Sequence, residues 1–359
     1  MTLWRAGALG GILLTLLLAL FLQEAKAEPP GYQVGVRHLT LVDESRSIKA
    51  SMGFEGSPTR RLDTTVWYPA KSKQGATAED APLAKGGPWP LLIYSHGTFA
   101  HADNIMHLVN DLVAHGYVVA APDYPLTSRA AFTRIQGPDV SDVVNQTADI
   151  GFIIDSLLAD RTFGPVIDKT RIGTTGHSLG AVTSYFASFA AETRDPRVAA
   201  TALLGAGDPV QAALSTDMGL AGAHLAPVSV PVLFLTAERD VFALLTGRPH
   251  GAYSRLEPPK YEAVVKDGVH VWFTDSDAQP ADGKNPDCLF FERMAPDMKV
   301  RGCDGGAELI GPARQQEITR IAVRAFFDAY LKQDAGALER LRELGTGPGD
   351  VELVYEEQD

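Results

Sequence analysis

A serine between two glycines is the feature of this 359-residue sequence that points most directly to chemistry. The pentapeptide Gly176-His177-Ser178-Leu179-Gly180 follows the strand-like stretch Arg171–Thr175 and precedes the helical stretch AVTSYFASFAA. A serine hydroxyl is a weak nucleophile, so it needs exposure, orientation and a neighbouring base. A tight strand-to-helix turn with glycines on both sides supplies the exposure and the orientation. The pattern predicts Ser178 as a catalytic nucleophile, with an ordinary glycine-rich turn as the structural alternative.

An acidic residue should follow a nucleophile of this kind, because a serine on such a turn is succeeded along the chain first by an acid and then by a histidine. Asp240 closes the segment PVLFLTAERD, where its carboxylate could orient an imidazole and stabilise the imidazolium. Two alternatives remain. Asp208, in LLGAGDP after the preceding strand, ranks second, and Glu238, on the same turn as Asp240, ranks third.

His270 is the predicted general base among nine histidines. It comes directly after the strand-like YEAVV and the turn Lys266-Asp267-Gly268, from which a loop side chain can reach over the sheet edge toward Ser178. The other eight precede the acid, lie inside the serine turn or follow the acid too closely. Order and position together therefore favour His270.

Two backbone amides are expected to stabilise the oxyanion that forms when a serine attacks a carbonyl group. One is the amide of Leu179, and the other is the amide of Thr98, with Phe99 next to it, in the loop after the strand Pro90–Tyr94. Phe99 and Trp272 flank the predicted centre and are candidates for lining an acyl or alcohol pocket. Aromatic residues at such positions are equally often plain core residues.

The elements that must position these residues alternate between short apolar runs and longer helical patterns. This alternation is typical of an α/β fold in which helices cover both faces of a mostly parallel sheet. The first two expected strands are antiparallel. The expected strands are Tyr32–Val42, Leu62–Tyr68, Pro90–Tyr94, Tyr117–Ala121, Arg171–Thr175, Ala199–Leu204, Val232–Thr236 and Glu262–Val265, and the expected helices are 104–115, 141–159 and the closing helix 313–332.

Three segments lack regular patterns. Residues 71–88 are rich in Lys, Gly and Ala and predict a surface loop. Residues 205–230 and 274–311 are longer, and loops of this length inside a compact domain often act as lids or binding loops. No linker divides the chain, so residues 28–359 are predicted to form a single catalytic domain.

The first 27 residues have the pattern of a signal peptide. Arg5 precedes the uncharged run Ala6–Leu22, and Ala25-Lys26-Ala27 offers small residues where a signal peptidase cleaves. A retained membrane anchor is the alternative, but the run is short for a bilayer span. We therefore predict removal after Ala27, no stable membrane insertion and a secreted or periplasmic protein.

Charge and cysteine content restrict the possible partners. The formal net charge is −12, and removal of residues 1–27, which carry a net +1, makes it −13. Such a chain repels nucleic acid and anionic membrane surfaces. Cys288 and Cys303 are the only cysteines and predict a disulfide in an oxidising compartment. A metal site is not expected, because two thiols without a nearby histidine make a poor ligand set.

Taken together, these stretches resemble the predicted dienelactone hydrolase branch of the α/β-hydrolases, which is related to platelet-activating factor acetylhydrolases and bacterial polyester hydrolases. The resemblance implies an α/β-hydrolase fold and a Ser–Asp–His triad, with Ser178 as nucleophile and His270 as base. The acetylhydrolase members place the acid after the earlier strand, which would favour Asp208. The stretches that carry the resemblance are TTVWYPA (64–70), LLIYSHG (91–97), VVNQTADIGFIIDSLL (143–158), RIGTTGHSLGA (171–181) and PVLFLTAERD (231–240).

The expected function is therefore hydrolysis of carboxylic esters through an acyl-enzyme, without a cofactor. The substrate would be a small-molecule or lipid ester, and GVHVWF around His270 departs from the context of many relatives, so its identity stays open. The alternatives within enzymes are a lactone or dienelactone hydrolase, a phospholipid acetylhydrolase and a polyester hydrolase. A binding protein on a hydrolase scaffold is the non-enzymatic alternative.

Overall fold

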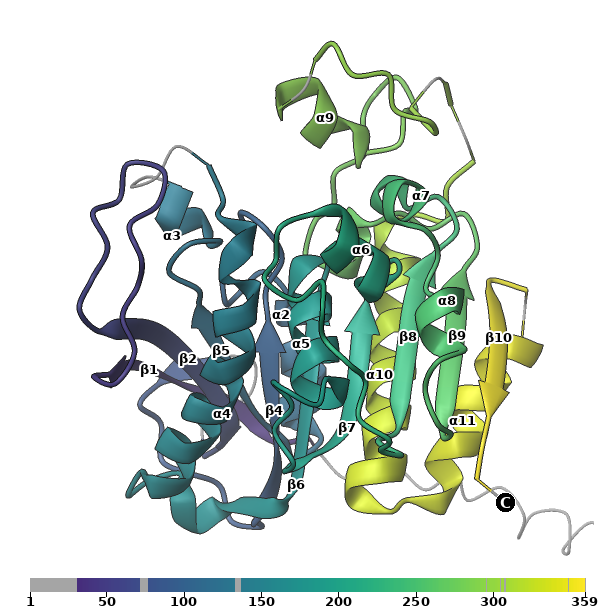
Figure 1. Ribbon diagram of the computed structural model, residues 1–359. Helices are drawn as coiled ribbons and strands as arrows, with labels where there is room; N and C mark the ends of the chain where they lie inside the picture. The colour runs from purple at the N-terminus through teal and green to yellow at the C-terminus, as the bar shows by residue number, and fades with distance from the viewer. Residues whose placement is uncertain are drawn as a thin grey trace, which may run out of the picture. The chain divides into compact units, whose positions relative to one another are not determined.

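Ten strands form one sheet in the computed structural model, in the order β10-β9-β8-β7-β6-β4-β5-β2-β1-β3 (Figure 1). The structure describes residues 31–71, 77–132, 137–294, 296–303, 305–306, 308–347 and 349–358. The predicted signal peptide, residues 1–27, lies outside the described residues. From Tyr32 onward the described chain forms one compact unit.

The sheet is parallel in its centre and antiparallel toward its edges. Strands β4 to β9 run parallel, whereas β1 pairs antiparallel with β2, β2 with β5, and β10 with β9. The strands are β1 (Gln33–Asp43), β2 (Arg60–Ala70), β3 (Ala78–Glu79), β4 (Trp89–Ser95), β5 (Val118–Asp123), β6 (Ile167–His177), β7 (Val198–Leu204), β8 (Val232–Ala237), β9 (Lys260–Val265) and β10 (Val351–Glu356).

Helices cover both faces of this sheet, as the alternating pattern predicts (Figure 1). One core layer joins α2 and α10 to the strands, and the layers on the other face are built by α4 and by α5 with α6. The helices are α2 (Met106–Ala114), α3 (Arg129–Phe132), η1 (Val140–Asp142), α4 (Val143–Ala159), η2 (Gly164–Val166), α5 (Leu179–Phe189), α6 (Pro209–Ser215), α7 (Val241–Thr246), α8 (His250–Tyr253), η3 (Val271–Phe273), α9 (Cys288–Met294), α10 (Pro312–Lys332) and α11 (Ala335–Thr346).

The strand order reverses at β4, because β5 lies on one side of it and β6 on the other. Parallel strands on either side of such a reversal send their connections to opposite faces of the sheet, which opens a crevice at their carboxyl ends. The loop after β4 and the turn after β6 meet at this point. These are the two segments that carry the predicted oxyanion donors and the predicted nucleophile.

The C-terminal end of the chain differs from the prediction. The helix 313–332 is present as α10 but does not close the fold, because α11 and the edge strand β10 follow it. Within β10 only Val351 is buried, and Val354 and Tyr355 are exposed. A short edge strand with one buried side chain has almost no burial pattern, so only its pairing with β9 reveals it.

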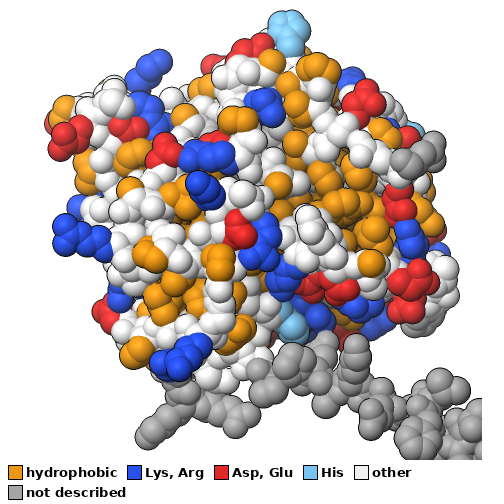
Figure 2. Space-filling model, turned by 90° about the horizontal axis from the view of Figure 1, so that it is seen from below, with side chains coloured by type: hydrophobic (Ala, Val, Ile, Leu, Met, Phe, Trp, Pro, Cys, Tyr) orange, Lys and Arg blue, Asp and Glu red, His pale blue; other side chains and the backbone are white. Residues whose placement is uncertain are grey.

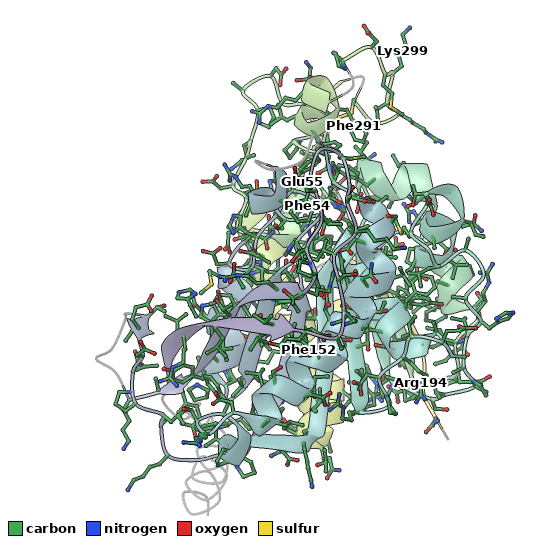
Figure 3. All side chains as sticks on the ribbon, turned by 60° about the vertical axis from the view of Figure 1, so that its left-hand side comes forward. Phe54, Glu55, Phe152, Arg194, Phe291 and Lys299 are labelled. Atoms are coloured by element: carbon green, nitrogen blue, oxygen red, sulfur yellow. A yellow bond between two sulfur atoms is a disulfide. The ribbon has the colours of Figure 1, made fainter. Side chains whose placement is uncertain are left out.

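The two long irregular segments behave differently. Residues 205–230 contain α6 and pack onto the α5 side of the core through Ala212, Ala213, Met218 and Leu220. By contrast, residues 274–303, here called the α9 segment, rise above the carboxyl ends of the strands (Figures 1 and 3), where Phe291 and Lys299 lie. The α9 segment is therefore the better candidate for a binding loop.

The predicted disulfide between Cys288 and Cys303 is formed inside the α9 segment, with 5.8 Å between the two Cα atoms. Their neighbours Val241, Phe291 and Val300 form a small apolar cluster with Cys288.

The opposite end of the molecule shows basic and acidic side chains interspersed with apolar ones (Figure 2). In the part of the chain that the structure describes, no helix is long and apolar enough to span a bilayer.

Candidate active site

Ser178 lies on a sharp turn between β6 and α5. Its backbone has φ 56° and ψ −121°, a conformation that costs a non-glycine residue about 1–3 kcal/mol. Both glycines of the motif are sterically required. A Cβ on Gly180 would lie 1.9 Å from the Ser95 carbonyl oxygen, and one on Gly176 would lie 2.3 Å from the Gly180 oxygen. Ser178 is half-buried between buried neighbours, so the turn presents its side chain outward.

Asp240 and His270 are hydrogen-bonded to each other. The Nδ1 of His270 lies 2.8 Å from Oδ2 of Asp240, and the other carboxylate oxygen accepts a bond from the Ala243 amide at the start of α7. His270 is 4% exposed and Asp240 is 1% exposed. Because Nδ1 donates to the carboxylate, Nε2 is the basic nitrogen of the neutral ring.

The His270 ring lies beside the turn that carries Ser178. The Ser178 amide donates to the Leu204 carbonyl oxygen at 2.9 Å. Gly205, which follows Leu204, lies against the His270 ring. A Cβ on Gly205 would come within 3.0 Å of Nδ1 and 3.2 Å of Cε1 of His270. The rings of His177 and His270 have centroids 4.4 Å apart. The fold thus brings the predicted nucleophile and base, 92 residues apart in the numbering of the chain, to one place.

The two alternative acids are bonded elsewhere. Asp208 caps α6, where its Oδ1 accepts from the amides of Val210 and Gln211. Glu238 accepts from the amide of Asp267. Neither has a recorded bond to His270, so geometry favours Asp240 among the three acids.

Charge balance around His270 favours proton uptake. Burial lowers its pKa, but the charge and hydrogen bond of Asp240, with the charge of Asp287, outweigh burial and hold the pKa above its ordinary value. His177 shows the opposite shift, because burial and the neighbouring His270 hold its pKa well below the usual range. Its Nε2 therefore stays protonated in a neutral ring and donates to the His270 carbonyl oxygen at 3.1 Å.

The amides of Leu179 and Thr98 are the two predicted oxyanion donors. Leu179 is the first residue of α5, and the leading amides of a helix lack an intrahelical acceptor. No described residue is recorded as accepting a bond from the Leu179 or Thr98 amide. The Phe99 amide, by contrast, donates to the Thr127 carbonyl oxygen at 2.9 Å. Of the two residues predicted for the second donor, Thr98 therefore fits.

His96 braces the same loop from below. Its Nδ1 donates to the Gly97 carbonyl oxygen at 2.7 Å, and its Nε2 accepts from the Tyr124 amide at 3.0 Å. Burial lowers the pKa of His96, so the ring remains neutral and keeps both bonds. The loop that carries Thr98 is consequently held by side-chain bonds on its buried side.

A cavity of about 580 Å³ opens between this loop and the α9 segment. Its lining includes Phe99 and Val271, the direct neighbours of Thr98 and His270, although Ser178 and His270 themselves do not line it. A row of rings leads from the cavity to His270: the Phe290 ring lies 5.4 Å from Phe242, whose ring is 4.5 Å from His270. The lining residues are Phe99, Arg129, Val271, Ser276, Ala278, Pro286, Leu289, Phe290 and Arg293.

Trp272, the second aromatic residue predicted for a pocket, is not in that lining. It is buried, and its indole N–H donates to the Ala278 carbonyl oxygen at 3.0 Å. The structure thus gives Trp272 the role of anchoring the start of the α9 segment, and Phe99 alone of the two faces the cavity.

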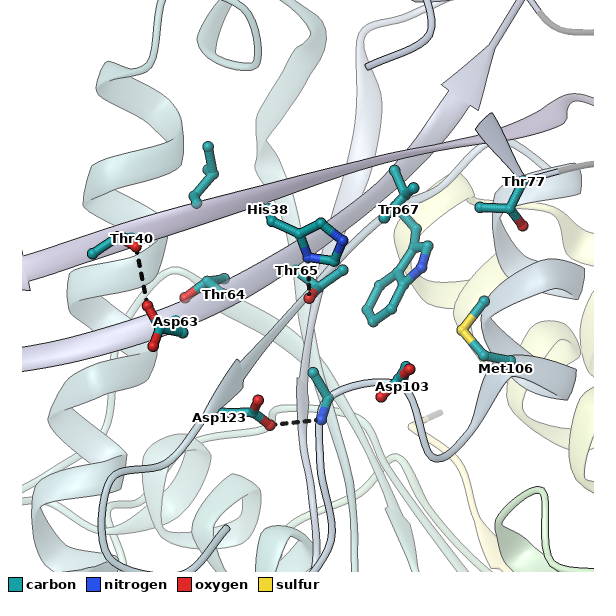
Figure 4. Close-up of a pocket in the computed structure, with 13 residues that line it drawn as sticks. His38, Thr40, Asp63, Thr64, Thr65, Trp67, Thr77, Asp103, Met106 and Asp123 are labelled. Atoms are coloured by element: carbon teal, nitrogen blue, oxygen red, sulfur yellow. Dashed lines mark hydrogen bonds between the residues drawn. The ribbon is translucent and has the colours of Figure 1, made fainter. Parts of the chain in front are cut away.

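Another cavity, of about 530 Å³, lies beside β1 and β2 (Figure 4). Five of its polar side chains are hydrogen-bonded to one another or to the backbone: His38 with Thr65, Thr40 with Asp63, and Asp123 with the Ala102 amide. None of the three predicted triad residues lines this cavity. Satisfied polar groups without a nucleophile make it a poor candidate for catalysis.

Asp287 is the residue of this site that sequence reasoning missed. It is fully buried and accepts hydrogen bonds from the backbone amides of Val241, His270 and Val271. It belongs to no motif, and its position next to Cys288 is the only signal in the sequence. Among the described residues, no group of three or more His, Cys, Asp or Glu side chains is arranged to hold a metal ion.

Comparisons with known proteins found one family match and similar solved structures. The family model described as Chlorophyllase matches residues 78–221, less than half of the chain. The match covers the turn of Ser178 and the loop of Thr98 and ends before Asp240 and His270. A ferulic acid esterase from Streptomyces cinnamoneus has a similar structure, with a TM-score of 0.65 and 22% identity over 90% of this chain and 96% of that chain.

The chain has an α/β-hydrolase fold. At this level of identity the structural likeness shows the fold, and the mostly parallel sheet with helices on both faces confirms the predicted fold class. The chlorophyllase family is related to the dienelactone hydrolase and acetylhydrolase branch that the sequence resembles. Together the two matches support a carboxylic ester hydrolase. No curated protein matches this chain.

Proposed function

We propose that this protein is an exported serine hydrolase that cleaves carboxylic esters through an acyl-enzyme intermediate. Ser178 is the nucleophile, His270 the general base and acid, and Asp240 the residue that orients the imidazole. The amides of Leu179 and Thr98 bind the oxyanion. The observation that carries the proposal is the hydrogen bond between Asp240 and His270. The imidazole ring of His270 lies beside the strained turn of Ser178.

The reaction proceeds in two halves. The Oγ of Ser178 attacks the ester carbonyl carbon while Nε2 of His270 takes the hydroxyl proton. The tetrahedral intermediate collapses, the bond to the alcohol oxygen breaks, and His270 returns its proton to the leaving alcohol. A water molecule then gives a proton to Nε2 of His270 and attacks the acyl carbon. The second tetrahedral intermediate breaks its bond to Oγ of Ser178, His270 returns the proton to that oxygen, and the acid leaves.

The substrate should carry an apolar group next to the ester. The cavity beside Phe99 and Val271 is walled mainly by Leu289, Phe290 and Pro286 and is large enough for a small-molecule or lipid group. Two guanidinium groups, of Arg129 and Arg293, also line it, and neither forms an ion pair with a residue that the structure describes. In a chain of net charge −12, these cations favour an ester that also carries a negative charge.

Export is part of the proposal. The disulfide between Cys288 and Cys303 is the structural feature that supports it, since such bonds persist in oxidising compartments. The predicted destination is the periplasm or the cell exterior.

Substitution of Ser178→Ala tests the proposal. We expect the variant to lose about 10⁴–10⁶-fold of kcat on p-nitrophenyl esters and to lose labelling by a fluorophosphonate probe, because the attacking oxygen is gone. Ser215→Ala is the matched control. Ser215 is exposed on α6 and bonds only to backbone carbonyl oxygens of its own helix, so this variant should keep both readouts. Full activity in Ser178→Ala would refute the proposal.

A panel of esters separates the remaining substrate classes. Acyl chains of graded length, a lactone, a phospholipid with a short acyl chain and a polyester film distinguish a simple esterase from its alternatives. The proposed cavity predicts the highest kcat/KM for esters with a medium-sized apolar or aromatic acyl group.

A further inference from the structure

One buried carboxylate joins the two loops that carry Asp240 and His270. Oδ2 of Asp287 accepts from the His270 amide at 3.0 Å and from the Val241 amide at 3.2 Å, and Oδ1 accepts from the Val271 amide at 3.0 Å. Val241 directly follows Asp240. Asp287 therefore bridges the backbone of the predicted acid and the backbone of the predicted base at a single point.

Asp287 is itself held from two sides. Its amide donates to Oδ1 of Asn285 at 2.9 Å, and Nδ2 of Asn285 donates to the Arg239 carbonyl oxygen at 2.7 Å. Both side chains are buried. On the other side, the next residue, Cys288, is disulfide-bonded to Cys303. The α9 segment thus fastens this carboxylate beneath the cavity that its own residues Pro286, Leu289 and Phe290 line.

We propose that Asp287 is a positioning residue of the triad, which fixes the distance between the Asp240 and His270 loops and favours the protonated form of His270 with its negative charge. This inference rests on the proposed function. Asp287 touches backbone amides only, so it neither contacts the substrate nor exchanges a proton with it.

The charge of Asp287 is maintained against an energetic cost. Burial and the nearby Asp240 carboxylate raise its pKa to about 6, while His270 and the amide bonds act in the opposite direction. A carboxyl whose pKa is raised by folding contributes stability that is present at low pH and is lost as the pH rises through about 6. At neutral pH the ionised Asp287 side chain therefore lowers the stability of the fold. A contribution to the triad explains its presence better than a contribution to folding does.

The titratable side chains in recorded contact with His270 come from three elements. Asp240 follows β8, Asp287 precedes α9, and His177 ends β6. Since His177 stays neutral, the two carboxylates are the groups that raise the pKa of the His270 imidazolium. Removal of the charge at Asp287 should therefore lower that pKa.

Asp287→Asn tests this role, because asparagine keeps the shape and one acceptor oxygen but removes the charge. We expect kcat per fluorophosphonate-titrated site to fall about 10–100-fold, with KM changed less than about threefold. The acidic limb of kcat/KM should move to lower pH by about one unit. Asp282→Asn is the matched control: Asp282 lies in the same segment, is exposed and pairs with Lys284, so kcat and the acidic limb should stay as in the wild type.

An unchanged kcat and acidic limb in folded Asp287→Asn would overturn the inference. If that variant does not fold, the double variant Cys288→Ser/Cys303→Ser tests the inference instead. It keeps the negative charge of Asp287 and removes only the disulfide that holds the adjacent residue in place. Its kcat should fall severalfold while the acidic limb stays in place, and an unchanged kcat would again overturn the inference. Failure of the proposed function is distinguishable, because Ser178→Ala would then retain activity whatever happens at Asp287.

Discussion

Two buried clusters of this molecule are each built around one buried basic side chain and two aspartates, and they differ in whether a nitrogen of that side chain lacks a hydrogen bond. At the edge of the first cluster, the partly exposed Arg46 also pairs with Asp149 at 2.9 Å. In the first, Arg60 of β2 bonds to Asp142 and Asp149 beside and within α4, through four contacts of 2.6–2.9 Å. All three side chains are at least 98% buried. Every nitrogen of the guanidinium is occupied, so this cluster can only hold β2 against α4.

In the second cluster, His270 bonds to Asp240 through its ring and to Asp287 through its backbone amide. Here Nε2 has no hydrogen-bond partner among the described residues, and the ring lies with its centroid 4.4 Å from that of His177, the residue before Ser178. The difference indicates that burial and charge pairing alone do not make a reactive site. One basic atom must remain unbonded next to a nucleophile and a cavity.

The largest loss of activity should come from removing the hydrogen bond between the His270 ring and Asp240 in the second cluster. Asp240→Asn is expected to lower kcat about 10⁴-fold, because an amide cannot hold His270 in the tautomer that leaves Nε2 basic. Steady-state kinetics on a p-nitrophenyl ester would measure it. Asp208→Asn is the control, since asparagine caps a helix as well as aspartate does, and both activity and stability should stay near wild type. The reverse result would assign the acid to Asp208.

Breaking the first cluster should affect stability instead of chemistry. Arg60→Met leaves buried Asp142 without an arginine and buried Asp149 with Arg46 alone, and it is expected to cost about 3–5 kcal/mol of the free energy of unfolding, measured from urea denaturation. Arg61→Met removes an exposed arginine that pairs with an equally exposed Asp63, so its cost should stay below about 1 kcal/mol. Activity per folded Arg60→Met molecule should match the wild type, and a lower value would mean that the two clusters are coupled.

The smallest effect concerns the cavity next to the second cluster. For the double variant Arg129→Gln/Arg293→Gln, we expect kcat/KM to fall about three- to tenfold on a p-nitrophenyl ester whose acyl chain ends in a carboxylate, because exposed cations contribute weakly. Hydrolysis of the uncharged p-nitrophenyl butyrate should not change. The wild-type preference for the charged ester should also weaken at high salt. Equal losses on both esters would argue against a role in substrate charge recognition.

Local patterns in the chain were sufficient for the central elements of the fold. All eight expected strands and the three expected helices are present, with ends shifted by a few residues. The sequence also revealed the turn at Ser178, because its glycines at positions 176 and 180 stand in a short motif between a strand and a helix. The structure shows why glycine is needed there: a Cβ would collide with the backbone of the turn or of the end of β4. The edge strand β10 was not, since a single buried side chain produces no periodicity.

By itself, the sequence determined the α/β class, the strained serine turn and the order of the candidate triad, because these depend on short-range backbone preferences and on burial repeating along the chain. Only the tertiary structure favours Asp240 over Asp208, since both follow strands and only the packing of loops from distant positions puts Asp240 2.8 Å from His270. For the same reason, Asp287 became visible only once the α9 segment was folded over the strand ends. The carboxylate of Asp287 accepts hydrogen bonds from three backbone amides in two other loops, and the residues next to Asp287 in the sequence form no pattern that predicts these bonds.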